Sequence, residues 1–122
     1  MTLSAESAFK EFIDIIAKLR NPDGGCPWDI AQTHQSIRPY LVEETYEVLE
    51  AIEQNDDREL MNELGDVLLQ VALHAQIAND RQAFSITDVV KAVSDKMIKR
   101  HPHVFGETKA KDANEVLKNW EQ

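Results

Sequence analysis

The stretch RELMNELGDVLLQVALHAQIAN, residues 58–79, decides the fold class of this chain. Apolar side chains recur in it every three or four residues, which is the period of one face of an α-helix. They are Leu60, Leu64, Val67, Leu68, Val71, Ala75 and Ala78. Asn55-Asp56-Asp57 precedes the stretch and provides a cap. We therefore predict a helix from about Arg58 to Asn79, with an apolar stripe that is buried against other helices.

Working outward, the neighbouring segments have the same period. We predict a first helix capped by Thr2 or Ser4, followed by a loop over residues 21 to about 35 with one short turn around Thr33. A second helix is predicted from Ser36 or Pro39 to Gln54. Its apolar stripe consists of Leu41, Val48, Leu49 and Ile52. A fourth helix runs from about Ile86 to His101-Pro102, and Asp112 opens a short last helix. No segment alternates with the period of a strand. The expected fold is all-α, an antiparallel bundle of four main helices plus a short C-terminal helix.

Length and charge limit the classes of function. With 122 residues, the chain is expected to form a single domain over residues 1–122. Twenty-two acidic against 13 basic residues give a formal charge of −9, which disfavours nucleic acid as a partner. A chain this short buries a modest fraction of its surface, so we expect a homo-oligomer that covers a second apolar face.

Cysteine content and the N-terminus indicate the compartment. Cys26 is the only cysteine, so no intrachain disulfide can form. Met1 to Phe9 has no basic region followed by an apolar core, so no signal peptide is expected, and no apolar run approaches a membrane span. We expect a cytoplasmic protein without a membrane partner.

Four acidic residues lie at the border of the apolar stripes, whereas charges that serve only solubility face away from such stripes. Glu44 and Glu47 lie on one flank of the second helix, about 60° from the centre of its apolar stripe. Glu63 and Asp66 lie on the corresponding flank of the third helix, and both pairs have i, i+3 spacing. Antiparallel packing brings the four carboxylates together, and a hard cation such as Mg²⁺ or Mn²⁺ offsets their repulsion. Solvated surface charge is the alternative for each pair taken alone.

Two nearby residues refine this interpretation. A di-iron bundle needs Glu-x-x-His on its helices, whereas Glu47 and Asp66 occupy those positions here, and His74 is better explained as a histidine at the edge of the core. Gly65 weakens the third helix by about 1 kcal/mol relative to alanine, which indicates that something approaches the backbone closely there.

Basic and aromatic residues complete the candidate site. Lys96 and Arg100 form an i, i+4 pair on the apolar side of the fourth helix. Binding of phosphate and favourable placement at a helix C-terminus explain them equally well. Gly24-Gly25 lacks the lysine of a phosphate-binding loop. Trp28 and Trp120 are candidates for stacking on a nucleobase or for anchoring a core or an interface.

The motifs also carry a resemblance. GCPWD at 25–29, QTH at 32–34, PYLVEETYEV at 39–48, ELGD at 63–66 and DKMIKRHPHVFG at 95–106 together resemble the MazG family. The resemblance implies an all-α, usually dimeric nucleoside triphosphate pyrophosphohydrolase that binds Mg²⁺. It makes Glu44, Glu47, Glu63 and Asp66 the ligands and catalytic acids, Lys96 and Arg100 contacts of the triphosphate, and Trp120 an aromatic residue near the nucleotide. It leaves Glu43 outside the ligand set.

The expected reaction is hydrolysis of an NTP or dNTP to the monophosphate and pyrophosphate, with Glu47 a candidate for orienting the attacking water. Many members with this resemblance carry two such domains in tandem, whereas this chain holds one and is most similar to the amino-terminal repeat. A non-catalytic helical dimerisation or regulatory module is therefore the alternative. A relative specialised for one pyrimidine deoxynucleotide or a phosphoribosyl-nucleotide is the third.

Overall fold

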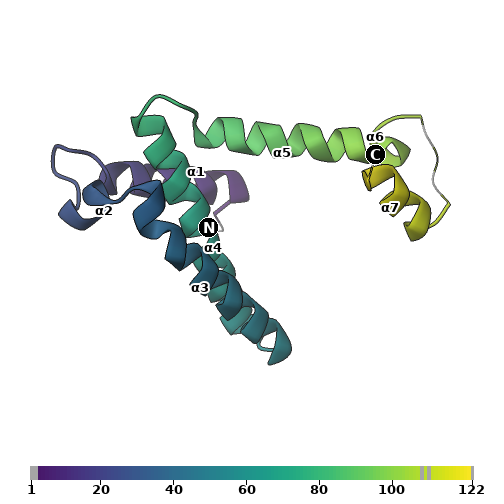
Figure 1. Ribbon diagram of the computed structural model, residues 1–122, viewed down its shortest axis with the longest axis horizontal. Coiled ribbons are helices and arrows are strands. Elements are labelled where there is room, and N and C mark those ends of the chain that lie inside the picture. The colour runs from purple at the N-terminus through teal and green to yellow at the C-terminus, as the bar shows by residue number, and fades with distance from the viewer. Residues whose placement is uncertain (1–2, 108, 110, 122) are drawn as a thin grey trace. The chain divides into compact units, whose positions relative to one another are not determined.

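A computed structural model describes residues 3–107, 109 and 111–121, and over these residues it contains helices and no strands (Figure 1). The all-α prediction is confirmed. The chain divides into two compact units, residues 1–85 and 86–122. The described residues contain no helix with the length and apolar content that crossing a membrane requires.

The first unit is built on a helical hairpin. Helices α3 (His34–Glu53) and α4 (Asp57–Asp80) run antiparallel side by side, joined by a tight turn in which Asn55 has a φ of 55° (Figure 1). Helix α1 (Ala5–Leu19) packs against α4, and the short α2 (Pro27–Ala31) lies in the loop between α1 and α3.

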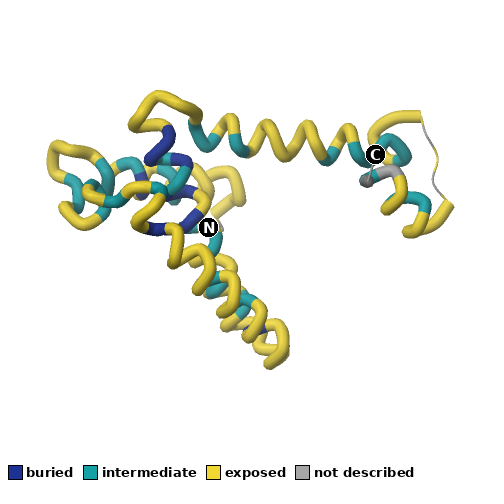
Figure 2. Tube along the Cα trace, viewed as in Figure 1, coloured by how far each residue is buried: buried dark blue, intermediate teal, exposed yellow. Residues whose placement is uncertain are grey.

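A small core holds these helices together. Its buried members come from α1, α3 and the C-terminal half of α4: Ile16, Ile37, Ala72, Leu73 and Ile77. Figure 2 shows the buried segments gathered at this end of the hairpin, while most of the end near the α3–α4 turn is exposed. The α1 side therefore provides most of the packing, and the turn end of α3 and α4 has less cover.

Local capping explains the helix boundaries. Ser4 accepts a hydrogen bond from the backbone N–H of Ser7 at 3.1 Å, and Thr2, the other predicted cap, lies outside the described residues. Helix α3 begins at His34, earlier than predicted, because Thr33 and Ser36 form a reciprocal capping box. Asp56 caps α4 at the backbone N–H of Glu59, as expected from the sequence.

Helix α2 was not predicted. Its sequence PWDIA lies within the segment expected to be a loop, and proline stands at its first position, where a missing N–H costs nothing. Arg20 stabilises its C-terminal end, donating from Nη1 to the carbonyl oxygens of Asp29 and of Gln32, the latter at 3.1 Å. The contact depends on a residue from another helix, so local periodicity does not reveal it.

The predicted apolar stripes coincide only in part with the buried faces of this unit, since Ala75 and Ala78 of the α4 stripe are buried. On α3 the buried residues are Ile37 and Ala51, whereas Leu41, Leu49 and Ile52 are 37%, 49% and 52% exposed. On α4, Leu64, Leu68 and Val71 are also exposed. The prediction that these members of the stripes are buried was wrong for the single chain, because each helix has a wide apolar surface and its partner covers only one side of it.

The second unit contains α5 (Ile86–Arg100), α6 (Pro102–Phe105) and α7 (Ala113–Glu121). The backbone N–H of Glu115 donates to Asp112 Oδ1 at 3.0 Å, so Asp112 caps α7 as predicted. The four-residue α6 was not predicted, and proline stands at its start as well.

Candidate metal and nucleotide site

Three of the four predicted acids come together between α3 and α4. Glu44 on α3 and Glu63 and Asp66 on α4 each offer one carboxylate oxygen, and these oxygens lie within 4.8 Å of one another. Glu44 is half-buried because it follows the same helical face as buried Ile37 and Ala51. Its carboxylate is therefore directed at α4 and lies within the helix interface, not at its border.

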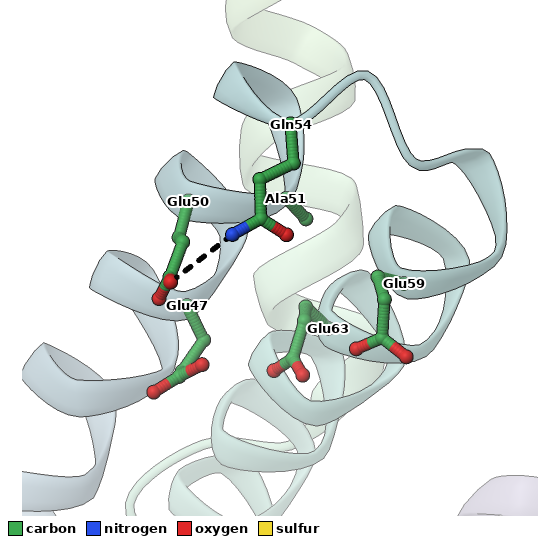
Figure 3. A pocket seen from close by; sticks show the side chains of 6 residues that line it. All are labelled: Glu47, Glu50, Ala51, Gln54, Glu59 and Glu63. Carbon is green, nitrogen blue, oxygen red and sulfur yellow. Dashed lines mark hydrogen bonds between the residues drawn. The ribbon is translucent and has the colours of Figure 1, made fainter.

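Glu47 lies beside this three-residue cluster. It lines a hollow of about 120 Å³ at the turn end of the hairpin together with Glu63, and Glu50, Ala51, Gln54 and Glu59 complete the lining (Figure 3). In Figure 3 the side chains of Glu47 and Glu63 extend into the space between α3 and α4. Gln54 donates to Glu50 at 3.2 Å, so Glu50 is held at the edge of this hollow.

The acids perturb one another. Burial raises the pKa of Glu44, and the charges of Asp66, Glu47 and Glu43 and a hydrogen bond to Asp66 raise it further. Burial also raises the pKa of Glu63, with the charges of Asp66, Glu47, Glu44 and Glu59 as further causes. The ion pairs among the described residues join Lys10–Asp14, Arg20–Asp80 and Lys91–Asp95, and none of them reaches this cluster.

The donor set fits a hard divalent cation. Mg²⁺ binds carboxylate oxygens, and Glu44, Glu63 and Asp66 would hold it, since each offers one oxygen within 4.8 Å of the others and an inward movement of these side chains would bring all three to one ion. The cluster contains no histidine, and His74 is hydrogen-bonded to His34 instead, so the set does not match a di-iron site.

The predicted phosphate-binding residues lie in the second unit. The guanidinium of Arg100 lies over the ring of Trp120, 4.8 Å from its centroid, and His101 meets the same ring edge-on at 5.7 Å. Lys96 is exposed, one turn before Arg100 on α5. Within the second unit, the cation of Arg100 and the aromatic ring of Trp120 therefore lie together.

Aromatic residues also lie near the acids of the first unit. Trp28 on α2 is 51% exposed, which excludes a core anchor within this unit, and its ring centroid lies 6.3 Å from that of Tyr40. Tyr40 precedes Glu44 by one turn of α3. Sequence reasoning missed Tyr40, although its i, i+4 spacing from Glu44 was the available signal.

Two other residues differ from the sequence-based picture. A Cβ added at Gly65 would meet no atom within 4 Å, so the described residues do not make the close approach that was predicted there. Gln70 is a buried polar side chain, 6% exposed, one turn after Asp66 on α4. It was not singled out, because a glutamine in an apolar helix carries no motif.

The chain is similar to known proteins of one family. Residues 32–105 match the MazG nucleotide pyrophosphohydrolase domain. The chain is 55% identical over 100 residues to a nucleoside triphosphate pyrophosphohydrolase/pyrophosphatase MazG of Thermotoga maritima, which covers 82% of this chain and 39% of that protein. It is 49% identical over 110 residues to a nucleoside triphosphate pyrophosphohydrolase of Escherichia coli K12, covering 90% of this chain and 42% of that protein.

The chain thus spans about two fifths of the length of these two relatives. Among solved structures, a crystal structure of a mazG-related protein from Thermotoga maritima aligns with a TM-score of 0.71 at 28% identity. The alignment covers 93% of this chain and 94% of the other.

Proposed function

The chain belongs to the MazG family of nucleotide pyrophosphohydrolase domains, and from this premise we propose that it hydrolyses nucleoside triphosphates, NTPs or dNTPs, to the monophosphate and pyrophosphate with Mg²⁺. Mn²⁺ is the expected substitute, since it also prefers oxygen ligands. We place the reaction in the cytoplasm, where these substrates are found. We also propose that the whole chain acts as one domain.

The observation that carries this proposal is the convergence of Glu44, Glu63 and Asp66. The raised pKa values of Glu44 and Glu63 and the mutual repulsion of the carboxylates favour a bound cation, with Glu47 as a fourth ligand or as the base that orients water. The cation would offset phosphate charge and lower the pKa of a bound water. Water oxygen attacks the α-phosphorus, the bond from that phosphorus to the α–β bridging oxygen breaks, and pyrophosphate leaves.

Lys96 and Arg100 are assigned to the triphosphate, where two cations offset the charge on the leaving pyrophosphate. Trp120 is assigned to the nucleobase. Its contact with Arg100 supports this role, because a guanidinium over one face of the indole fixes the ring and leaves its other surface for stacking. The exposed Trp28–Tyr40 pair is a second aromatic surface for the nucleoside, one turn from Glu44.

The test is pyrophosphate release from each of the common NTPs and dNTPs, with Mg²⁺ and with EDTA. We expect metal-dependent release of pyrophosphate and monophosphate, and we expect Glu44→Gln and Asp66→Asn to abolish it. Glu53→Gln is the matched control, since Glu53 is an exposed glutamate on α3 outside the cluster. Absence of turnover by folded protein with every nucleotide would favour the non-catalytic module, and normal turnover by either cluster variant would refute the ligand assignment.

A homodimer accompanies this function. The surface of α4 that α3 leaves open carries Met61, Leu64, Leu68 and Val71, each at least 37% exposed and spaced by three, four and three residues. This is the spacing of a seam between packed helices, and α3 adds exposed Leu41, Leu49 and Ile52. A second copy of the hairpin is the partner whose pattern matches, because it presents the same stripe.

Sedimentation equilibrium tests the dimer. We expect the unmodified chain to sediment as a dimer and Leu68→Glu to shift it to monomer, while Ile15→Glu on exposed α1 leaves the mass unchanged. A monomeric unmodified chain at high concentration would contradict this assignment.

A further inference from the structure

A polar row crosses the interface between α3 and α4. Asp66, Gln70 and His74 follow one another at intervals of four residues, so they form a single ridge of side chains along α4. Two atoms of this row, Gln70 Oε1 and His74 Nε2, are buried and have no hydrogen-bond partner among the described residues. Buried polar atoms are nearly always hydrogen-bonded, so these two call for an explanation.

The hydrogen bonds at the far end of the row determine where its protons lie. Arg81 donates from Nε to His34 Nε2 at 3.2 Å, so that nitrogen carries no proton. His34 must then carry its proton on Nδ1, which lies 2.8 Å from His74 Nδ1. The two rings are nearly parallel, at 3°, and their centroids are 5.1 Å apart. The centroid separation equals the nitrogen–nitrogen distance plus about one ring width, half from each ring. The two rings therefore meet edge to edge, and the Nδ1–H of His34 lies in their common plane.

It follows that His74 accepts at Nδ1 and holds its own proton on Nε2. The two buried atoms without partners are then complementary, since His74 Nε2–H is a donor and Gln70 Oε1 is an acceptor one turn away. The other end of the Gln70 amide is a donor, and the residue one turn further along the row, Asp66, accepts only.

We propose that Gln70 is a positioning residue for the metal-binding carboxylate of Asp66. In the described structure Gln70 Oε1 and His74 Nε2 each stand without a partner. The proposed arrangement brings them together: Gln70 accepts from His74 Nε2–H and donates from Nε2 to the oxygen of Asp66 that does not hold the cation. The resulting chain runs in one direction, from Arg81 through His34, His74 and Gln70 to Asp66. The proposal rests on the assignment of Asp66 as a ligand in the proposed function.

The physical reason is the exposure of Asp66. The carboxylate is exposed, and among the described residues it has a hydrogen bond to Glu44 but no ion pair that fixes its orientation. A carboxylate that binds metal through one oxygen leaves the other to accept a hydrogen bond, and such partners orient the ligand. The donors here form a series in which each bond polarises the next, beginning at the guanidinium cation of Arg81.

The first experiment measures Mn²⁺ binding to the protein without substrate, by electron paramagnetic resonance of the free ion. We expect Gln70→Leu to weaken Mn²⁺ binding about tenfold, the range typical for residues that orient a ligand. Gln76→Leu is the matched control, since Gln76 lies on the same helix and donates to Asp80 at 2.9 Å, away from the row. Unchanged Mn²⁺ affinity in folded Gln70→Leu would overturn the proposal.

A spectroscopic readout needs no variant. In ¹⁵N-histidine NMR we expect His34 as the Nδ1–H tautomer and His74 as the Nε2–H tautomer, and we expect the His74 Nε2–H resonance to move when Mg²⁺ is added. The opposite tautomer of His74, or a resonance that does not respond to Mg²⁺, would overturn the chain of hydrogen bonds. Loss of the response in Gln70→Leu, with Gln76→Leu unaffected, would support it.

A double variant separates this role from simple packing. If His74 acts through Gln70, His74→Phe weakens Mn²⁺ binding as Gln70→Leu does, and the combined variant is no weaker than Gln70→Leu alone. Additive losses would mean independent structural effects and would refute the proposal. Failure of the proposed function has a different signature: Asp66→Asn would then bind Mn²⁺ like the unmodified chain, or Mn²⁺ would bind normally with no nucleotide hydrolysed.

Discussion

Replacing Glu44 with glutamine should stabilise the metal-free protein while removing its response to Mg²⁺. The substitution deletes one charge from a cluster whose ligand oxygens lie within 4.8 Å of one another. One pair of charges at that distance repels by about 1 kcal/mol at the dielectric constant of water and by about 3.5 kcal/mol at an effective value of 20. Because Asp66 is exposed and salt screens the pair, we take the lower figure, about 1 kcal/mol.

The pH dependence gives the sign. The pKa of Glu44 is raised in the folded chain above its ordinary value of 4.5, so the folded state binds protons more tightly than the unfolded state. The associated stability is fully present below pH 4.5 and is lost as the pH rises through the folded pKa. The gain from Glu44→Gln should therefore appear near neutral pH and vanish near pH 4.

Urea unfolding in EDTA, at neutral and acidic pH, measures both effects, with Glu53→Gln as the control on the same helix. Added Mg²⁺ should raise the urea midpoint of the unmodified chain and of the control but not of Glu44→Gln. A loss of stability in Glu44→Gln of equal size at both pH values would refute the reasoning, because it would mean that attractive contacts hold this carboxylate.

Three further predictions concern stability. Burial, with the charge of His34 as a second cause, lowers the pKa of His74 below 6.5. The contribution of His74 to folding stability is therefore present above pH 6.5 and is lost as the pH falls through the folded pKa. His74→Phe should flatten that part of the profile of urea midpoint against pH, and an unchanged slope would contradict this prediction. Gly65→Ala should raise the free energy of unfolding by about 1 kcal/mol, because the added Cβ meets no atom within 4 Å, and a lower melting temperature would show that another molecule approaches there. Ile37→Ala should lower the free energy of unfolding by about 2–5 kcal/mol, since this side chain is 0% exposed, whereas exposed Ile98→Ala should change it by less than about 0.5 kcal/mol in the same calorimetric scan.

Sequence reasoning anticipated the helices better than their faces. The caps at Ser4, Asp56 and Asp112 were found because a cap depends on residues three or four positions apart. Helix α2 was missed because its C-terminal end depends on Arg20 of α1. Glu44, Glu63 and Asp66 were singled out from their spacing, although Glu44 lies on the buried line of α3 and not at its edge.

What the sequence determined by itself is therefore local: the all-helical class, most helix ends, and the acidic pairs on two consecutive helices. Only the tertiary structure decided which side of each helix is buried. Helices α3 and α4 carry apolar residues around much of their circumference, so their pattern is compatible with more than one packed face. Packing of α1 and α3 against α4 selected the face that contains Glu63, Gln70 and His74, and left the Leu64–Leu68 side exposed. The reason is that periodicity records interactions within one helix, whereas burial depends on a partner whose position no local pattern encodes.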